Sequence, residues 1–412
     1  MDQVVVSTMG IVLNAYVAKW ESNMSLLSGN SFNSASVGRK AALRALSQFN
    51  PTDYKRTRNF LDGNVSKLSP YITHGILSLR EIWSLLKSKY GLREKDKFFN
   101  ELVWRDYFLH VWKWKGSEIF FPLIHDREPI ICESSVPKDI VAGKTGLRVI
   151  DETVYQLYNT GYVHNHARMW IASYLIHFRK VDWKIAADWF YSHLLDGDLG
   201  SNHLSWQWVA GTSRTGIYLF NAENVAKFAP HKFNIKNSQL DKTYEELHEI
   251  ALSPDPIGQE SIGKGENLIE PQLFTSPTEV FPDISESIEK DAFIIHPWNI
   301  GFYERNNLKQ KKIAVIFTEF HQKHPWNKKR WDFVVNSMKE TCSNIYLCSN
   351  MRHMKSRITS FDQHLTEVPS FKKGCLTFLS EPIISEVSEK YCKSYSSYWR
   401  VVEKKLRTTK LD

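Results

Sequence analysis

Cysteine is scarce in this sequence, and its pattern suits neither disulfides nor zinc. The chain of 412 residues has five cysteines, an odd number, and no CxxC pair occurs among them. Disulfide frameworks and zinc sites show paired cysteines at regular spacing. Both are therefore excluded as organising features, and the low cysteine content favours a reducing, cytoplasmic setting.

Long hydrophobic runs and phosphate-binding loops are also lacking. No stretch of the sequence reaches the about 20 apolar residues that a membrane-spanning helix needs. The N-terminus has no basic start and is interrupted by Ser, Thr and Asn, which makes it a poor signal peptide. No GxGxxG or GxxxxGK[ST] loop is present. We therefore expect a cytoplasmic monomer without a membrane partner or a standard nucleotide loop.

Aromatic and basic residues are what the sequence has in excess. Aromatic residues make up 13% of the chain, with 14 tryptophans, and the formal net charge is +8. A basic chain suits a polyanionic partner, because lysine and arginine release phosphate counterions on binding. Several cations crowd one early stretch, which could equally be a solvated basic face: Arg39, Lys40, Arg44, Lys55, Arg56 and Arg58.

Periodicity divides the chain into four segments. After an N-terminal extension (1–37), helical spacing dominates residues 38–235, and a segment rich in Pro, Ser, Gly and acid at 236–290 reads as a linker. Within the helical region, Ser69-Pro70 starts one expected helix and Gly91 ends it. Residues 291–412 predict a small α/β domain, with strands at 311–317 and 344–349, a helix at 327–340 and a third strand within 375–379.

Two acidic or histidine patterns in the helical region look at first like metal sites. His164 and His166 form an HxH pair, but residues two apart on a helix point to different faces. Asp196 and Asp198 flank a glycine, but no EF-hand spacing follows them. We therefore expect no metal.

Several long motifs occur in a characteristic order. They are "ELVWRDYF", "TGYVHNHARMW", "VDW" and "DGDLGSNHLSWQW", preceded by "SKLSPYITHGILSLR". Together, over about residues 38 to 230, they resemble the FAD-binding domain of the DNA photolyase/cryptochrome family. The resemblance implies an all-α domain that holds FAD non-covalently, followed here by the linker and the small α/β C-terminal domain.

The resemblance also implies residue roles on the cofactor side. Arg58, Ser66 and Ser69 match groups around the pyrophosphate, Arg168 is expected to pair with Asp196, and Asn202 is expected to face flavin N5. The full set implied to bind FAD is Tyr54, Arg58, Ser66, Ser69, Arg168, Asp196, Asp198 and Asn202.

On the substrate side, the implied partner is DNA that contains a pyrimidine dimer. Trp104 and Trp208 match the tryptophans that flank a flipped-out dimer, and Glu101 matches the acid that hydrogen-bonds a thymine edge. Asn165 and Met169 stand where enzymes acting on (6-4) products carry histidines, which favours cyclobutane dimers. Trp206 and Trp183 match the first two members of a chain that feeds electrons to the flavin.

The sequence departs from the family pattern in several places. The usual N-terminal antenna domain is absent, which leaves a second, antenna chromophore open. The third tryptophan of the electron chain has no counterpart in residues 125–140. Glu152, Tyr155 and Tyr162 replace Ala, Arg and Trp, and residues 212–230 are shortened. These changes bear on DNA affinity and repair more than on FAD binding.

Three functions remain open on the sequence. The first is a photolyase that repairs cyclobutane dimers with excited reduced FAD. The second is a cryptochrome-like blue-light sensor, signalling by flavin redox change to a protein partner through the C-terminal domain. The third is a flavoprotein of the same fold kept for nucleic-acid binding or structure. A repair assay and light dependence discriminate among them.

Overall fold

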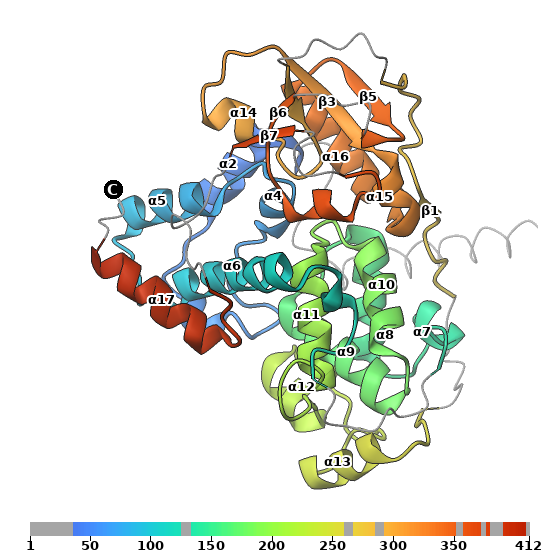
Figure 1. The fold of residues 1–412 in the computed structure, drawn as a ribbon. Coiled ribbons are helices and arrows are strands. Elements are labelled where there is room, and N and C mark those ends of the chain that lie inside the picture. The colour runs from blue at the N-terminus through green and yellow to red at the C-terminus, as the bar shows by residue number, and fades with distance from the viewer. Residues whose placement is uncertain are drawn as a thin grey trace, which may run out of the picture.

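The computed structural model has a helical part and a part built around a parallel sheet (Figure 1). It describes residues 36–124, 133–258, 267–284, 292–351, 357–371, 376–379 and 390–408. The N-terminal extension up to residue 35 and Cys132 therefore lie outside the described residues. In Figure 1 the sheet part lies at the top, and most of the helices lie below it.

Helices dominate the described chain from Gly38 to Leu252, as the sequence predicted for most of this region. The longer ones are α2 (Gly38–Gln48), α5 (Leu79–Tyr90), α6 (Lys97–Lys115), α8 (Arg148–Thr160), α9 (Asn165–Ser173), α10 (Trp183–His193), α11 (Leu199–Ala210) and α13 (Tyr244–Leu252). The shorter ones are α3 (Tyr54–Thr57), α4 (Ser69–Thr73), α7 (Lys138–Val141) and α12 (Ala222–Phe228). The helix α13 lies inside the segment expected to be extended.

Capping residues explain where several helices begin and end. The helix α8 ends at Gly161, which is left-handed at φ 66° and donates its N–H to Leu157 O. The helix α10 begins after Asp182, whose side chain accepts hydrogen bonds from the amides of Lys184 and Ile185. These local signals are readable in the sequence.

The stretch from Ser69 to Gly91, expected to be one helix, forms two. The helix α5 has its own start, because the Ser78 side chain accepts a hydrogen bond from the Glu81 amide. Between the helices, Gly75 has φ +60°, and a Cβ there would lie 2.3 Å from Trp298 O. Glycine is thus required at this break, because the backbone of the sheet part approaches closely.

The C-terminal part contains a five-stranded parallel sheet in the order β5-β3-β2-β6-β7. Its strands are β2 (Phe293–Ile295), β3 (Lys312–Phe317), β5 (Ile345–Cys348), β6 (Arg357–Ser360) and β7 (Leu376–Leu379). Between β3 and β5 run α15 (Thr318–Lys323), β4 (Trp326–Asn327) and α16 (Lys328–Thr341), and β4 pairs with β1 (Leu273–Phe274). The three expected strands and the expected helix are confirmed, whereas β2 and β6 were not predicted.

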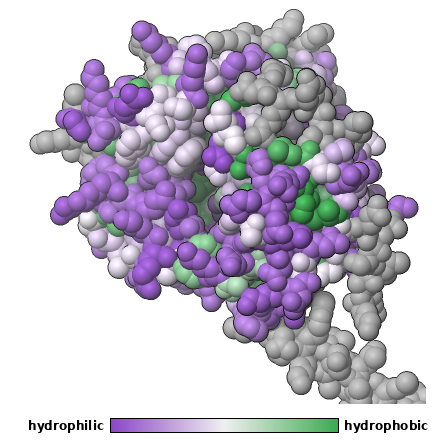
Figure 2. Space-filling view, turned by 90° about the horizontal axis from the view of Figure 1, so that it is seen from below, coloured by the Kyte–Doolittle hydropathy of each residue, from purple (hydrophilic) through white to green (hydrophobic). Residues whose placement is uncertain are grey.

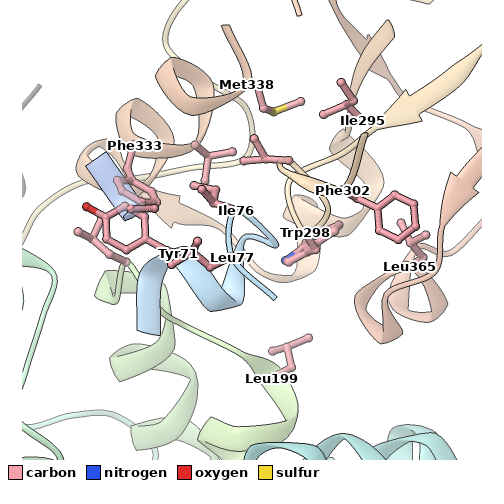
Figure 3. Close-up of a cluster of buried hydrophobic side chains, with 14 of the residues drawn as sticks. Tyr71, Ile76, Leu77, Leu199, Ile295, Trp298, Phe302, Phe333, Met338 and Leu365 are labelled. Carbon is pink, nitrogen blue, oxygen red and sulfur yellow. The ribbon is translucent and has the colours of Figure 1, made fainter. Parts of the chain in front are cut away.

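The hydrophobic core does not follow the boundary between the two parts. One cluster joins the helices α2, α4, α5, α6 and the last helix to the sheet part, and a second cluster holds the helices α7 to α13 together. The helices α10 and α11 contribute residues to both clusters. Figure 3 shows Tyr71, Ile76 and Leu77 beside Phe333 of α16 and Trp298. Burial of this joint apolar surface stabilises the two parts as one unit, since apolar burial contributes about 25 cal/mol per Å².

The last helix, α17 (Tyr395–Thr408), leaves the sheet part and lies against α6 (Figure 1). The helix α14 (Phe302–Arg305) follows β2.

Hydrophilic residues cover most of the described surface seen from below, with a narrow hollow near the centre of that face (Figure 2). Among the described residues, no helix is both long and apolar enough to cross a membrane.

Candidate functional site

The Asp196-Gly197-Asp198 loop connects α10 to α11 and carries two buried carboxylates. The Nη2 group of Arg168, on α9, donates hydrogen bonds to both carboxylate oxygens of Asp196, at 3.0 and 2.7 Å. The Asp196 side chain is 4% exposed. A charge-assisted contact of this kind fixes both side chains, and the pair expected from the sequence is present.

Asp198 has a different set of partners. Its Oδ1 accepts from the Ser201 amide at 2.6 Å and so caps α11, while Oδ2 lies 3.3 Å from Arg105 Nη2. Burial acts to raise the pKa of Asp198, but Arg105, His364 and the Ser201 hydrogen bond outweigh it, and the pKa falls below its usual value. The carboxylate therefore stays ionised, and it orients both the helix and the arginine.

Tyr162 connects the Arg168–Asp196 pair to a second group of side chains, which come from α3 and α6. The Arg168 guanidinium lies 5.8 Å from the Tyr162 ring centroid, and burial raises the pKa of Tyr162 to about 12. Tyr54 has Glu101, Arg58 and Tyr162 as its charged or ionisable neighbours. The structure thus brings together expected residues from widely separated stretches of sequence.

Cations border this group on the side of the 64–69 loop. Burial, and then His166, Arg168 and Lys67, lower the pKa of His164 to about 4. Its Nε2 is buried and without a hydrogen-bond partner among the described residues. Burial also lowers the pKa of Lys67. The positive charge of Arg168 and Lys67 beside His164 is an environment that would favour a bound anion.

The two expected pyrophosphate hydroxyls lie on the same loop as Lys67. Ser66 Oγ accepts a hydrogen bond from the Leu68 amide at 3.4 Å, which is at the weak limit of such bonds. Ser69 is the first residue of α4 and is half-buried. Both residues neighbour Lys67 in the chain, and their role toward a pyrophosphate stays a prediction.

Asn202 and the two electron-chain tryptophans belong to α10 and α11. Asn202 Nδ2 donates to Ala187 O at 2.9 Å, which makes its side-chain oxygen the atom available to a ligand. Trp206 and Trp183 are 3% and 7% exposed, and they contact the rings of Phe190 and His203 respectively. Part of the 125–140 stretch, where a third member would lie, is outside the described residues.

Trp104 is close to the group but has a partner that the sequence did not indicate. Its ring stacks on Tyr395 of α17, with centroids 3.8 Å apart and planes at 5°. Tyr395 Oη also donates to Asn100 O at 3.0 Å. The neighbouring acid, Glu101, lies 2.8 Å from Lys97 Nζ and 3.6 Å from Arg58 Nη1. One face expected to be open to a base is thus covered by α17.

Trp208 is covered in a similar way. The Arg214 guanidinium lies 3.8 Å from its ring centroid, and Tyr218 contacts the ring at 5.7 Å. Asn165 and Met169 lie one turn apart on α9, exposed and half-buried respectively. Asn165 and Met169 thus share α9 with Arg168, and one face of each tryptophan, Trp104 and Trp208, is occupied within the chain.

The histidine pair does not converge on a common point. His164 Nδ1 accepts from the His166 amide, whereas the His166 ring contacts Asn59 O at 2.7 Å. Within the described ranges, no cluster of three or more His, Cys, Asp or Glu side chains has a geometry that could hold a metal ion. FAD is instead compatible with this donor set, because the cations and the orphaned His164 Nε2 suit a phosphate group.

Comparison with known proteins covers the helical part. Residues 98–242 match the family model described as the FAD binding domain of DNA photolyase. The deoxyribodipyrimidine photo-lyase of Vibrio cholerae is 30% identical over 230 residues, which are 52% of this chain and 47% of that protein. The cryptochrome DASH of Idiomarina loihiensis is 32% identical over 200 residues, covering 45% of this chain and 44% of that protein.

The helical region is similar to the FAD-binding domain of the DNA photolyase/cryptochrome family. The chain spans about half the length of the curated photolyase and cryptochrome relatives that it matches. Among solved structures, a Synechocystis cryptochrome is similar with 27% identity and a TM-score of 0.43, covering 46% of this chain and 43% of that one. A class III photolyase from Agrobacterium tumefaciens has 24% identity and a TM-score of 0.43, covering 53% and 55%.

Several residues of the candidate site were not found from the sequence. Arg105 directly follows Trp104 in "ELVWRDYF", so the motif itself could have indicated it. His364, Tyr395 and Arg330 reach the region from the C-terminal part. No local pattern could have indicated these three, because the family motifs end near residue 230.

Proposed function

We propose that this chain binds FAD non-covalently and repairs cyclobutane pyrimidine dimers in DNA under blue light. When bound, FAD would supply the photochemistry, namely a light-driven loan of one electron to the dimer that would break the two bonds joining the pyrimidines and then be returned. The cycle has no net oxidation or reduction. Relatives named deoxyribodipyrimidine photo-lyase support this reading.

The observation that carries FAD binding is the buried Arg168–Asp196 pair beside a cluster of cations. Arg58 and Lys67, with the Ser66 and Ser69 hydroxyls, would hold the pyrophosphate, and Tyr54 would pack beside them. Asp196 and Asp198 would hold the polar edges of the cofactor. Each carboxylate is already fixed by an arginine, so little ordering would be needed on binding.

Asn202 would tune the cofactor rather than merely hold it. Because its Nδ2 donates to Ala187 O, its side-chain oxygen is the atom left to face a ligand. A carbonyl oxygen accepts a hydrogen bond from a protonated ring nitrogen, and this contact favours the reduced form of a flavin. Trp206 and Trp183, both buried, would serve as the inner members of an electron-feeding chain.

The substrate face would be formed by Trp104, Trp208, Glu101, Asn165 and Met169. A flipped dimer stacks on aromatic faces, which contribute about 1–3 kcal/mol per base. In this structure Tyr395 occupies one face of Trp104, and Arg214 occupies one face of Trp208. The proposal therefore requires that DNA displace α17 from Trp104 and rotate Arg214 away from Trp208.

The test is repair of a cyclobutane thymine dimer in a short oligonucleotide by the purified full chain. The protein is loaded with FAD, reduced in advance and exposed to blue light, with a dark sample as control. We expect loss of the dimer in light alone. FAD binding without any light-dependent loss of the dimer would reject repair.

The covered Trp104 supports a second candidate, a blue-light sensor. In this case α17 continues to cover the substrate face. Reduction of the flavin would instead change the packing of α17 against α6, and this change would be the signal to a protein partner. Limited proteolysis of the FAD-bound chain in light and dark separates the two functions. Light-dependent cleavage near residue 390 without repair would favour the sensor.

A further inference from the structure

Arg330 reaches from the sheet part into the loop that carries Asp196 and Asp198. It lies on α16, and its side chain is fully buried. Its Nη2 donates to Gly197 O, and Nη1 lies 3.5 Å from Tyr191 O. A Cβ at residue 197 would be 2.5 Å from Nη1, so the loop and the guanidinium are in direct contact.

Aromatic rings hold the Arg330 guanidinium in place. It lies 3.8 Å from the Trp326 ring centroid and 4.8 Å from that of Tyr191. Stacking on two rings restricts the planar group to one orientation, which points its fork at the loop carbonyl. The position of Gly197 O is therefore set by side chains of α16 and β4, outside the residues that match the family model.

The charge of Arg330 acts on the same loop. Burial lowers its pKa, whereas Tyr191, Asp196 and Asp198 favour its charged form. Its hydrogen bonds in this structure go to carbonyl oxygens, and the two carboxylates already have Arg168 and Arg105 as partners. A buried cation is costly unless nearby negative groups stabilise it. Arg330 therefore adds a third positive charge to a loop with two carboxylates.

We propose that Arg330 is a positioning residue for the Asp196–Asp198 loop, so that the C-terminal sheet part completes the flavin site. This inference rests on the FAD binding proposed above. It assigns a role to the C-terminal part. The Arg330 guanidinium holds the loop through Gly197 O, while Arg168 and Arg105 orient the two carboxylates of the loop. The added positive charge also favours a reduced, negatively charged cofactor.

The test compares Arg330→Met with Lys329→Met in the full chain. Lys329 precedes Arg330 on α16 but is exposed, so its variant removes the same charge without touching the loop. Three quantities are measured: hydrogen exchange of the amides of residues 196–200 without FAD, the FAD dissociation constant, and the midpoint potential of bound FAD. Arg330→Lys keeps the charge but lacks the planar fork, and it replaces the methionine variant if that variant does not fold.

We expect Arg330→Met to speed exchange at residues 196–200 and to weaken FAD binding by about tenfold, as for loss of a hydrogen bond to a charged group. We also expect a shift of about tenfold toward oxidised FAD, or about 59 mV for one electron. Lys329→Met should match the wild type. A merely structural defect would lower stability without moving the potential of the FAD that still binds.

The possible failures are distinguishable. If the wild-type chain binds no FAD, the proposed function is wrong, and the flavin role of Arg330 falls with it. If the wild type binds FAD but Arg330→Met matches Lys329→Met in exchange, affinity and potential, the proposed function stands and the role of Arg330 is overturned. If the methionine variant cannot be prepared, Arg330→Lys takes its place. An Arg330→Lys variant that matches Lys329→Met in exchange, affinity and potential then overturns the role of Arg330.

Discussion

Trp104 and Tyr395 form a parallel stack, with ring centroids 3.8 Å apart and planes at 5°. The first residue is expected to receive a base, and the second belongs to the C-terminal helix α17. If a flipped base stacks on the same face of Trp104, α17 competes with substrate for that face.

Tyr395→Ala should therefore open the substrate face. We expect tighter binding of an oligonucleotide with a thymine dimer, at a stability cost of about 1 kcal/mol for the lost ring pair. Titration of labelled oligonucleotide and chemical denaturation measure the two effects. Tyr395→Phe is the matched control, because it keeps the stack and loses only the hydrogen bond to Asn100 O. Weaker DNA binding by the alanine variant would show that Tyr395 helps to form the DNA site.

The Arg168–Asp196 pair should be needed for both stability and FAD binding. Arg168→Met leaves a carboxylate that is 4% exposed without its arginine, and loss of one partner of a buried pair costs about 3–5 kcal/mol. We expect no bound FAD after purification. Asp332→Asn breaks an exposed pair with Lys328 and should cost about 0–1 kcal/mol. Equal effects of the two substitutions on unfolding would contradict the assignment.

Gly197→Ala tests the same loop from its backbone. A Cβ would lie 2.5 Å from Arg330 Nη1 and 2.9 Å from Tyr191 O, so the loop must shift. Overpacking of this kind costs about 1–3 kcal/mol. We expect weaker FAD binding in a fluorescence titration, whereas Gly91→Ala, at a glycine with open space around it, should leave FAD binding unchanged. Unchanged FAD affinity in Gly197→Ala would show that the loop does not contact the cofactor.

The stability of the fold depends on pH through His296. Burial lowers the pKa of His296 to about 4, and its neutral ring accepts from the Trp298 amide and bonds Ser360 O. The unfolded chain binds a proton near pH 6.5 and the folded chain does not, so stability is present above pH 6.5 and is lost as the pH falls toward 4. The loss is about 3 kcal/mol for this residue.

Urea unfolding between pH 7 and pH 4.5 measures this dependence. His296→Gln keeps a donor and an acceptor but cannot take up the proton, so its stability should fall less steeply over the same range. Identical slopes for the variant and the wild type would mean that His296 is not the group responsible.

The sequence indicated most of what local signals determine. The strands β3, β5 and β7 and the helix α16 were predicted, as were the helix end at Gly91 and the pairing of Arg168 with Asp196. The strand β2 was missed because it has only three residues, and β6 was missed because its sequence, RITS, contains no run of apolar residues. The split of the Ser69–Gly91 stretch was missed because the approach of Trp298 O to Gly75 is a tertiary contact.

The rest of the site could not be read from the sequence for the same reason. Tyr395 covers Trp104, and Arg330 supports Gly197, through contacts between residues far apart in the chain. Neither side chain lies in a recognisable motif, and both belong to the part outside the family match. The joint hydrophobic core explains why this part can reach the loop at all.

The central claim is that this chain has a flavin site built around Arg168 and Asp196. The FAD content of the purified full chain, measured by absorbance after reconstitution with excess FAD and removal of free cofactor, tests it most directly. The account predicts stoichiometric, non-covalent FAD in the wild type and none in Arg168→Met. A wild-type chain that stays folded but retains no FAD would contradict it.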